Sequence, residues 1–183
     1  MVYVFLAEGF EEIEAITFVD VLRRANVDVK TVGVTGKEVT GSHGIKLTAD
    51  ILIDEVNRDD LQMIYLPGGM PGAKNLSENE KVSDIIKYAH ENKKYIAAIC
   101  AAPFILGKSG LLKGVSATCY PGFEKDLIGA NITKSDYVFD QNILTGKGPG
   151  VALEFSLFAA SLFIGKAAAN RISGAMQFKY ELQ

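Results

Sequence analysis

Apolar runs of strand length alternate with helix-like patterns along the chain. A continuous apolar run at residues 2–7 predicts the first strand, and short segments rich in strand-forming residues predict others at 29–34, 63–66, 95–99 and 115–118. Apolar residues spaced three or four apart predict helices over residues 13–25, 79–90, 101–108 and 151–164. Because the strands are apolar throughout, we expect a sheet that is covered on both faces. The alternation therefore predicts an α/β fold with a mainly parallel central sheet and helices on both faces.

Two segments interrupt the alternation and predict β-hairpins. The first spans residues 38–47 around a Gly-Ser-His-Gly centre, and the second spans residues 137–144 around Asp-Gln-Asn. No linker, internal repeat or low-complexity stretch divides the chain. We therefore expect a single domain over residues 1–183, a length at which a hydrophobic core needs no disulfide bonds.

Composition and charge indicate which kinds of partner are not expected. Of the 183 residues, 48% are hydrophobic and 22% are charged, and the formal net charge is -3. Without a basic surplus, neither nucleic acid nor an acidic membrane surface is expected as a partner. No apolar run has the length of a membrane span, and no basic segment precedes the first run, which favours a strand over a signal peptide. Two cysteines make no disulfide framework, so we expect a reducing, cytoplasmic location.

The strongest chemical signal lies in residues 95–104. An apolar strand ends at Cys100 and a helix begins at once, which is the geometry of a nucleophile elbow. Small residues on both sides let neighbouring backbones approach, and a helix N-terminus favours thiolate over thiol. The alternative is a buried cysteine that serves as a small hydrophobic residue. The elbow context favours a reactive thiol.

Two other segments end strands at the edge of the sheet where ligands bind in open α/β folds. Residues 66–69 contain glycines whose backbone N–H groups could face an oxyanion. The first strand is followed by Glu11, Glu12 and Glu14. Acids that stabilise a helix N-terminus account for two of them. Glu14, one turn further in, is the candidate for burial beside Cys100.

Signals for metals and cofactors are weak. The histidines are His43 and His90, no Cys/His pair has zinc spacing, and His90 lies in a polar helix end. The glycine-rich residues 146–150 match neither a Walker A loop nor a dinucleotide fingerprint, and they favour a tight turn before the last predicted helix. We expect neither a metal nor a cofactor.

Taken together, the motifs at residues 9–14, 66–76 and 97–103 resemble the ThiJ/PfpI superfamily and, within it, the DJ-one subfamily in its bacterial or archaeal form. Further matches at residues 19–24, 117–121 and 145–150 extend the resemblance over nearly the whole chain. The resemblance implies a flavodoxin-like sandwich and a homodimer. Because the chain ends soon after Met176, we expect the extra C-terminal helix of animal members to be absent.

Site roles follow from the resemblance by motif match. Cys100 matches the reactive cysteine, and Glu14 matches the buried acid that hydrogen-bonds to it. Gly69 and Ala101 match the backbone N–H donors of the oxyanion hole. A protonated Glu14 is expected to hold the pKa of the thiol below its ordinary value.

The resemblance implies a cofactor-independent glyoxalase, which converts methylglyoxal to lactate, or a deglycase that removes glyoxal adducts. Its substrates would be small reactive carbonyls or glycated groups. The alternative is a redox-sensing chaperone in which Cys100 is oxidised to sulfinate without turnover. The protease-like branch carries His where Ala101 stands, which argues against a protease. His43 and Tyr120 replace an Arg and a His of some members and are accessory candidates.

Overall fold

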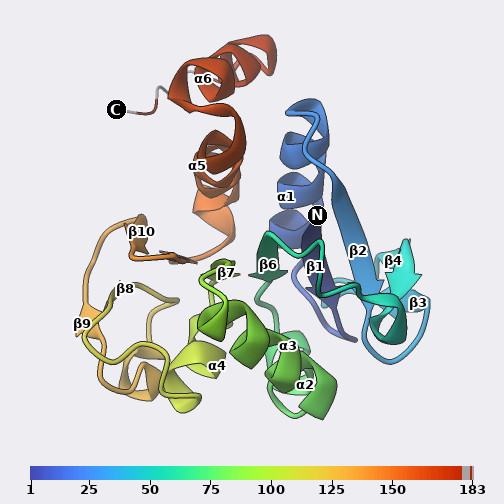
Figure 1. Cartoon of the computed structure of the whole chain (residues 1–183), viewed down its shortest axis with the longest axis vertical. Helices are drawn as coiled ribbons and strands as arrows, with labels where there is room; N and C mark the ends of the chain where they lie inside the picture. The colour runs from blue at the N-terminus through green and yellow to red at the C-terminus, as the bar shows by residue number, and fades with distance from the viewer. Residues whose placement is uncertain (179–181, 183) are drawn as a thin grey trace.

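A seven-stranded sheet forms the centre of the computed structural model, which describes residues 1–178 and 182. The strand order is β10-β11-β7-β6-β1-β2-β5 (Figure 1). The strands are β1 (Val2–Leu6), β2 (Val29–Gly33), β5 (Ile51–Leu52), β6 (Met63–Leu66), β7 (Tyr95–Ile99), β10 (Tyr137–Asp140) and β11 (Ile143–Gly146). Neighbouring strands are parallel except for the antiparallel pair β10 and β11. The prediction of a mainly parallel sheet is confirmed.

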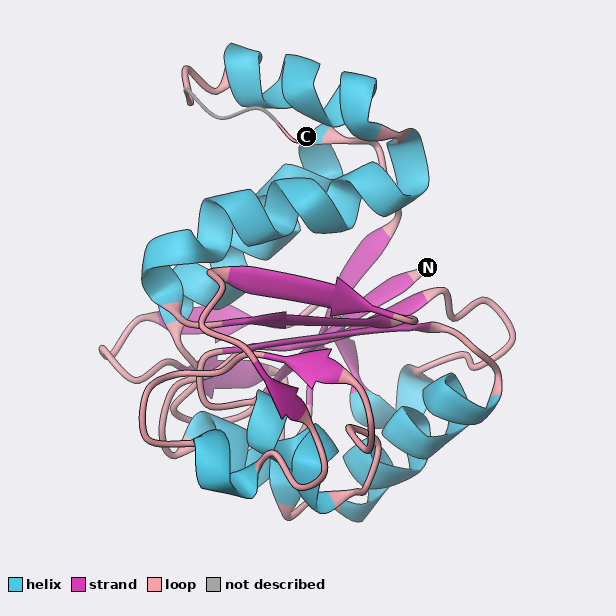
Figure 2. Ribbon diagram, turned by 90° about the vertical axis from the view of Figure 1, so that its left-hand side faces the viewer, coloured by secondary structure: helices cyan, strands magenta, loops and turns pink. Residues whose placement is uncertain are grey.

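Helices cover both faces of this sheet (Figure 2). One face carries α1 (Glu12–Arg24) and α5 (Ala152–Ile164), with α6 (Lys166–Ala175) packed on α5. The opposite face carries α2 (Gly72–Ser77), α3 (Glu80–Glu91) and α4 (Pro103–Lys108). Short 3₁₀ turns lie at Ile53–Glu55, Glu124–Asp126 and Pro149–Val151. Within the described residues, no helix combines the length and apolar character needed to cross a membrane.

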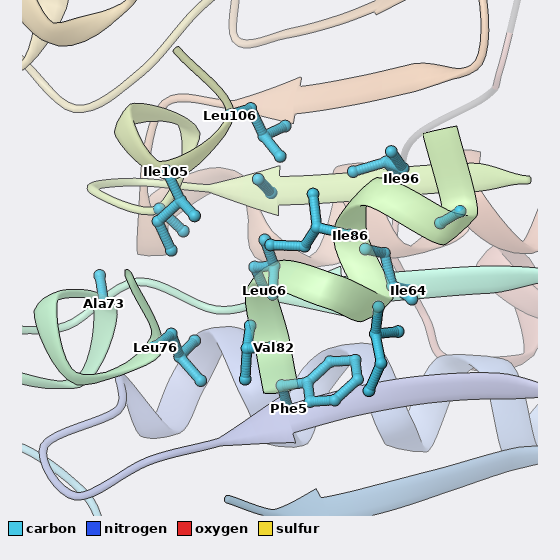
Figure 3. Packing of buried hydrophobic residues seen from close by; sticks show 14 of the residues in the cluster. Phe5, Ile64, Leu66, Ala73, Leu76, Val82, Ile86, Ile96, Ile105 and Leu106 are labelled. Carbon is cyan, nitrogen blue, oxygen red and sulfur yellow. The ribbon is translucent and has the colours of Figure 1, made fainter. Parts of the chain in front are cut away.

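The two-sided cover explains why the strands are apolar throughout. Successive side chains of β1 point to opposite faces, so Phe5 packs with the α2–α4 layer and Leu6 with the α1–α5 layer. Both side chains are completely buried. Figure 3 shows Phe5 and Ile64 of the sheet facing Val82 of α3. An alternating pattern would have left a polar side chain in one of these two layers.

Both predicted hairpins are present. The first is formed by β3 (Glu38–Thr40) and β4 (Lys46–Thr48), and the second by β10 and β11. The predicted strand at residues 115–118 is shorter, as β8 (Ser116–Ala117), and pairs with β9 (Asn131–Ile132) outside the central sheet. The backbone N–H groups of Ser116, in β8, and of Thr118, just after it, donate to the side chains of Asp140 and Thr145.

The expectation of a missing C-terminal helix is wrong. After α5 the chain turns at Gly165, whose φ of +79° is a left-handed value, and α6 begins at the next residue. The alanine-rich sequence of α6 favours helix on intrinsic propensity. A second unpredicted helix, α2, has six residues, too few for a spacing pattern to be recognised.

Candidate active site

Cys100 lies at a sharp turn between a strand and a helix. The strand β7 ends at Ile99, and α4 begins at Pro103. The φ of Cys100 is +62°, a value that non-glycine residues rarely adopt and that clusters at functional sites. Two backbone hydrogen bonds hold this conformation: the Cys100 N–H donates to Gly146 O over 2.9 Å, and the Tyr120 N–H donates to Cys100 O over 2.8 Å. The thiol is therefore fixed at the carboxyl end of a central strand and remains partly exposed.

The glycine turn after β6 brings a second strand end to the thiol. A Cβ atom on Gly68 would lie 2.6 Å from Cys100 Cβ, so only glycine allows this approach. The next residue, Gly69, has φ +85°, which also favours glycine. Hydrogen bonds from the N–H groups of Gly69 and Ala101 act on the Cys100 sulfur and lower its pKa. The two predicted oxyanion donors thus meet at one sulfur atom.

Glu14 reaches the same point from the first turn of α1. Its side chain has no exposed surface, and its Oε2 accepts a 2.7 Å hydrogen bond from the Gly68 N–H. The Tyr65 hydroxyl donates to the Glu14 carbonyl oxygen over 3.1 Å. The Tyr65 ring stacks on Phe18 at a centroid distance of 3.8 Å, which fixes α1 against β6. Glu14 is therefore buried at the end of β6, as expected for the deepest acid of the cluster.

Glu14 and Cys100 shift each other's pKa in the buried site. Burial raises the pKa of Glu14 to about 7, although hydrogen bonds with the Gly68 N–H and the Cys100 thiol oppose this rise. Burial, followed by the charge of Glu14, raises the pKa of the Cys100 thiol to about 12. The expectation of a thiol pKa below its ordinary value is therefore not borne out. A proton on Glu14 would remove the effect of its charge on the thiol but not the larger effect of burial.

The other oxygen of Glu14 is free to exchange that proton. Glu14 Oε1 is buried and, among the described residues, has no partner at conventional hydrogen-bond distance. Oε2 is already an acceptor for the Gly68 N–H, so a proton on Glu14 belongs on Oε1. A protonated Oε1 is a buried hydrogen-bond donor that no described residue accepts from.

His43, an accessory candidate, contacts the acids at the start of α1 and not Cys100 in the part of the chain that the structure describes. It lies at the tip of the β3–β4 hairpin, its side chain is 68% exposed, and its Nδ1 is 2.9 Å from Glu12 Oε2. The same nitrogen is 3.6 Å from Glu11 Oε2. Hydrogen bonding to Glu12, and then the charge of Glu11, raises the pKa of His43. No described contact joins its imidazole to Cys100, so any effect on the thiol passes through these acids.

Tyr120 and Cys119 lie beside the elbow. Tyr120 is bound to it through its backbone, and its half-exposed ring lies next to Gly148. Its accessory role stays a prediction. Cys119 is buried, and burial, together with the charges of Glu124 and Asp126, raises the pKa of its thiol to about 11. Both cysteines are free thiols.

Among the described residues, Glu11, Glu12 and His43 form a group whose ligand atoms lie within 4.8 Å of one another. Their composition would suit a divalent cation. The Glu12 carboxylate, however, already accepts hydrogen bonds from the backbone N–H groups of His43 and Ile45. We therefore assign no metal to this group.

Sequence reasoning missed two residues that shape the site. Gly68, which supplies the N–H donor for Glu14, was grouped with Gly69 in one motif. Glu12 was treated as a helix-start acid, although it is 4% exposed. The signal for its burial was Gly41, because a Cβ at that position would lie 2.3 Å from the Glu12 carboxyl group.

A parallel α/β sandwich with a thiol at a strand-to-helix elbow and a buried acid beside it defines a class of cysteine-elbow proteins. Comparison with known proteins identifies the family within that class: the model of the DJ-1/PfpI family matches residues 1–161, and the chain belongs to this family.

Individual relatives agree in sequence and structure. The chain is 38% identical to Protein DJ-1 homolog B of Arabidopsis thaliana over 93% of its residues, but it spans only 39% of that protein's length. It is 35% identical to Protein dj-1beta of Drosophila melanogaster, with 97% of this chain and 96% of the relative covered. The structure of oxidised Toxoplasma gondii DJ-1 matches with a TM-score of 0.93 at 34% identity, over 98% of both chains.

Proposed function

We propose that the protein is a cytoplasmic, cofactor-independent glyoxalase or deglycase that uses Cys100 to attack methylglyoxal or glyoxal adducts. The observation that carries this proposal is the convergence of three groups on one sulfur atom. The elbow fixes Cys100, the N–H groups of Gly69 and Ala101 act on its sulfur, and Glu14 is a buried acid with one oxygen unpaired. This is the set of groups that addition to a carbonyl requires.

In the first step, the Cys100 thiolate adds to the aldehyde carbon of methylglyoxal. A carbon–sulfur bond forms, and the carbonyl π electrons move to oxygen. The N–H groups of Gly69 and Ala101 stabilise the oxyanion, which takes the proton of Glu14 to give a hemithioacetal.

In the second step, the Glu14 carboxylate moves a proton between the two substrate carbons. It removes the proton from the carbon that carries sulfur and delivers it to the neighbouring carbon, while the hydroxyl proton moves to the second oxygen. The product is a lactoyl thioester. Water then cleaves the carbon–sulfur bond, so that methylglyoxal plus water gives lactate and the thiol is restored. A pKa of about 7 suits Glu14 to both giving and taking a proton.

Lactate formation from methylglyoxal in chelator-treated buffer tests this proposal. Wild-type protein is expected to turn over repeatedly, and Cys100→Ser to lose turnover because the nucleophile is gone. Cys119→Ser is the matched control, since Cys119 is a buried thiol outside the set of groups on Cys100. Absence of lactate with wild-type protein, or retention of activity in Cys100→Ser, would refute the enzyme.

A redox-sensing chaperone is the second candidate, and the unpaired Glu14 Oε1 favours it specifically. Peroxide would oxidise the Cys100 thiolate to sulfenate and then to sulfinate, releasing one water in each step. A protonated Oε1 could donate to a sulfinate oxygen. The oxidised form of the Toxoplasma gondii relative supports testing this chemistry. Stoichiometric sulfinate formation with suppression of client aggregation, but without lactate, would favour the sensor.

We also propose that two copies of the chain associate through α1 and the β3–β4 hairpin. Exposed Ile13 and Ile16 on α1 lie in this region together with exposed Ile45 on the hairpin. A groove of about 280 Å³ between α1 and the following strands is lined by Ile16, Val19 and Leu47. Clustered exposed apolar residues of this kind are typical of interfaces, and a two-fold axis would let the same face serve both copies.

Light scattering at micromolar concentration tests the dimer. Ile16 is 41% exposed, and Ile16→Glu is expected to give monomers because it buries a charge in the contact. Ile128 is 59% exposed and outside the proposed face, so Ile128→Glu should leave the dimer intact. A wild-type monomer, or an Ile16→Glu dimer, would contradict this surface.

A further inference from the structure

The Glu12 carboxylate binds the tip of the β3–β4 hairpin (residues 41–45) through several donors at once. Its Oε1 accepts the backbone N–H groups of His43 over 2.8 Å and of Ile45 over 3.3 Å. Its Oε2 accepts the Ser42 hydroxyl over 3.3 Å and pairs with His43 Nδ1 at 2.9 Å. A single side chain of α1 therefore closes the hairpin onto the helix.

The hairpin tip wraps this carboxylate closely. Glu12 is 4% exposed, and a Cβ on Gly41 would lie 2.3 Å from the carboxyl carbon and one of its oxygens. Burial on its own raises the pKa of Glu12, but hydrogen bonds from the His43 side chain and from backbone N–H groups outweigh it and lower the pKa to about 2. Glu12 is consequently an anion at neutral pH, with its acceptors available to the hairpin.

The hairpin in turn binds the loop that follows β1. The Gly9 N–H donates to Thr40 O over 2.8 Å, and the Ser42 N–H donates to Phe10 O over 2.8 Å. These two bonds join residues 40–42 to residues 9–10 as a strand is joined to its neighbour.

The same loop binds the glycine turn of the active site on its other side. The Glu11 N–H donates to Gly68 O over 3.0 Å, and the Gly72 N–H donates to Gly9 O over 3.1 Å. A Cβ on Gly69 would lie 2.4 Å from the Glu11 nitrogen, so loop and turn are in close contact. The hairpin tip, the loop and the glycine turn thus form three consecutive layers, and the last layer touches Cys100.

We propose that Glu12 is a positioning residue for the reactive thiol, acting through the hairpin tip and residues 9–11 to hold the N–H groups of Gly68 and Gly69 in place. The proposal rests on the proposed function only for its turnover readout, because its effect on the thiol is measurable without any substrate.

The chemistry of the site gives the direction of the effect. The Gly68 N–H stabilises the Glu14 carboxylate, and the Gly69 N–H stabilises the Cys100 thiolate. If the turn moves away, loss of the Gly69 N–H destabilises the thiolate and raises the pKa of Cys100, whereas loss of the Gly68 N–H keeps Glu14 protonated and removes a charge that raises it. Because the Gly69 N–H acts on the sulfur directly, the pH midpoint of Cys100 alkylation is expected to rise overall, a response that a loss of overall stability alone does not produce.

Alkylation of Cys100 by iodoacetamide as a function of pH is the test, with mass spectrometry to assign the labelled cysteine. Glu12→Ala is expected to raise the midpoint by about 0.5–1 pH unit, equivalent to a roughly 3- to 10-fold lower thiolate fraction at a fixed pH below it. Glu12→Gln retains a carbonyl oxygen for the His43 and Ile45 N–H groups and should restore a midpoint close to that of the wild type.

Two further variants distinguish the effect of the Glu12 carboxylate from other effects of changing the hairpin. Glu38→Gln removes an exposed acid from β3 of the same hairpin and should change nothing. Gly41→Ala keeps every side chain of the contact but forces a methyl group onto the carboxylate, so it should raise the midpoint as Glu12→Ala does. It serves as the decisive variant if Glu12→Ala does not fold.

A folded Glu12→Ala or Gly41→Ala protein with the wild-type midpoint would overturn the proposal, as would an equal rise in Glu38→Gln. The outcome is independent of the enzyme assay. If wild-type protein forms no lactate while Glu12→Ala still shifts the midpoint, the proposed function fails and the positioning role stands. If lactate forms normally and the midpoint does not move, the positioning role fails alone.

Discussion

Glu12 and Glu14 lie two residues apart in the first turn of one helix, and both are buried, yet their protonation differs. Glu12 has a pKa of about 2 and Glu14 a pKa of about 7. Burial raises the pKa of both side chains, and Glu14 is the deeper of the two, with no exposed surface against 4% for Glu12. The hydrogen-bond donors around each carboxylate decide whether the effect of burial is outweighed.

Glu12 receives two backbone N–H groups, a hydroxyl and an imidazole nitrogen, whereas Glu14 receives a single backbone N–H group and faces a thiol. A carboxylate with several donors is a permanent anion and serves as an anchor. A buried carboxylate with few donors stays close to its titration point and can exchange a proton. Donor count thus separates an anchoring acid from a proton-carrying acid on the same helix turn.

The largest effect is expected when the proton carrier is removed. Glu14→Gln and Glu14→Leu should each lower lactate formation by roughly 10²–10⁴-fold, the usual contribution of a general acid or base. Neither side chain exchanges a proton, so both should lose turnover to a similar extent. Steady-state kinetics with methylglyoxal measures this loss. Turnover in Glu14→Gln within a few-fold of the wild type would exclude a proton-transfer role.

The same variants differ in their effect on the thiol. In Glu14→Gln, the Gly68 N–H should hold the new amide oxygen in the place of Oε2, so the amide N–H₂ group would face the sulfur as a donor without a charge. This variant is therefore expected to lower the pKa of Cys100, because the charge of Glu14 raises it. Glu14→Leu removes both charge and donor, and its alkylation midpoint should lie above that of Glu14→Gln. Equal midpoints in wild type, Glu14→Gln and Glu14→Leu would mean that Glu14 does not act on the sulfur.

The second effect concerns the free energy of unfolding at acid pH and tests whether Glu12 anchors the hairpin. The pKa of Glu12 falls from 4.5 to about 2 on folding, so between these values the unfolded chain binds more protons and the unfolding free energy rises with pH. The contribution is at most about 3 kcal/mol, complete above pH 4.5 and lost toward pH 2. Urea unfolding should show a flattened slope over this range in Glu12→Gln. Glu38→Gln should keep the wild-type slope, and an unchanged slope in Glu12→Gln would contradict the anchor.

The third effect concerns Glu14, for which the free energy of unfolding changes with pH in the opposite direction. Glu14 has a folded pKa of about 7 against 4.5, so the folded protein binds more protons between these values and its stability falls as the pH rises through them. Glu14→Gln should remove this loss and gain stability relative to the wild type from about pH 4 to pH 8. The effect should be smaller than for Glu12, because Cys100 shares the proton. Parallel curves for wild type and variant would show that Glu14 is not protonated in the folded state.

Much of the fold was predictable because its determinants are local. Continuous apolar runs marked the central strands, and short polar centres marked both hairpins. The carboxyl ends of parallel strands meet at one edge of the sheet. This rule alone predicts that Glu14, Gly69 and Cys100 lie in one region. The exception is β8, which was predicted as a longer strand. Side chains accept hydrogen bonds from backbone N–H groups in and just after it, and a single sequence does not reveal such partners.

The electrostatics of the site were not predictable in the same way. The sequence favoured a low thiol pKa from the helix N-terminus, but burial and the nearby Glu14 charge act against it. The difference in role between Glu12 and Glu14 depends on a hairpin some 30 residues downstream, whose tip supplies hydrogen-bond donors to Glu12 but not to Glu14. Spacing identifies which acids start a helix, whereas the donors of each carboxylate are set by tertiary contacts.

The smallest effect is expected from His43, the exposed member of the anchor. His43→Ala leaves both backbone N–H donors of Glu12 in place, so the acid slope of the unfolding free energy should shift far less than in Glu12→Gln. The folded pKa of His43 is raised above 6.5, so the stability that its charge supplies is complete below pH 6.5 and is lost as the pH rises through the folded pKa. Wild-type protein should show this small loss just above pH 6.5, and His43→Ala should lack it. His90→Gln, which changes the second histidine on α3, is the control and should retain the loss. If His43→Ala instead flattens the acid slope as much as Glu12→Gln, the imidazole and not the backbone holds the hairpin, and the contrast between Glu12 and Glu14 reduces to a single ion pair.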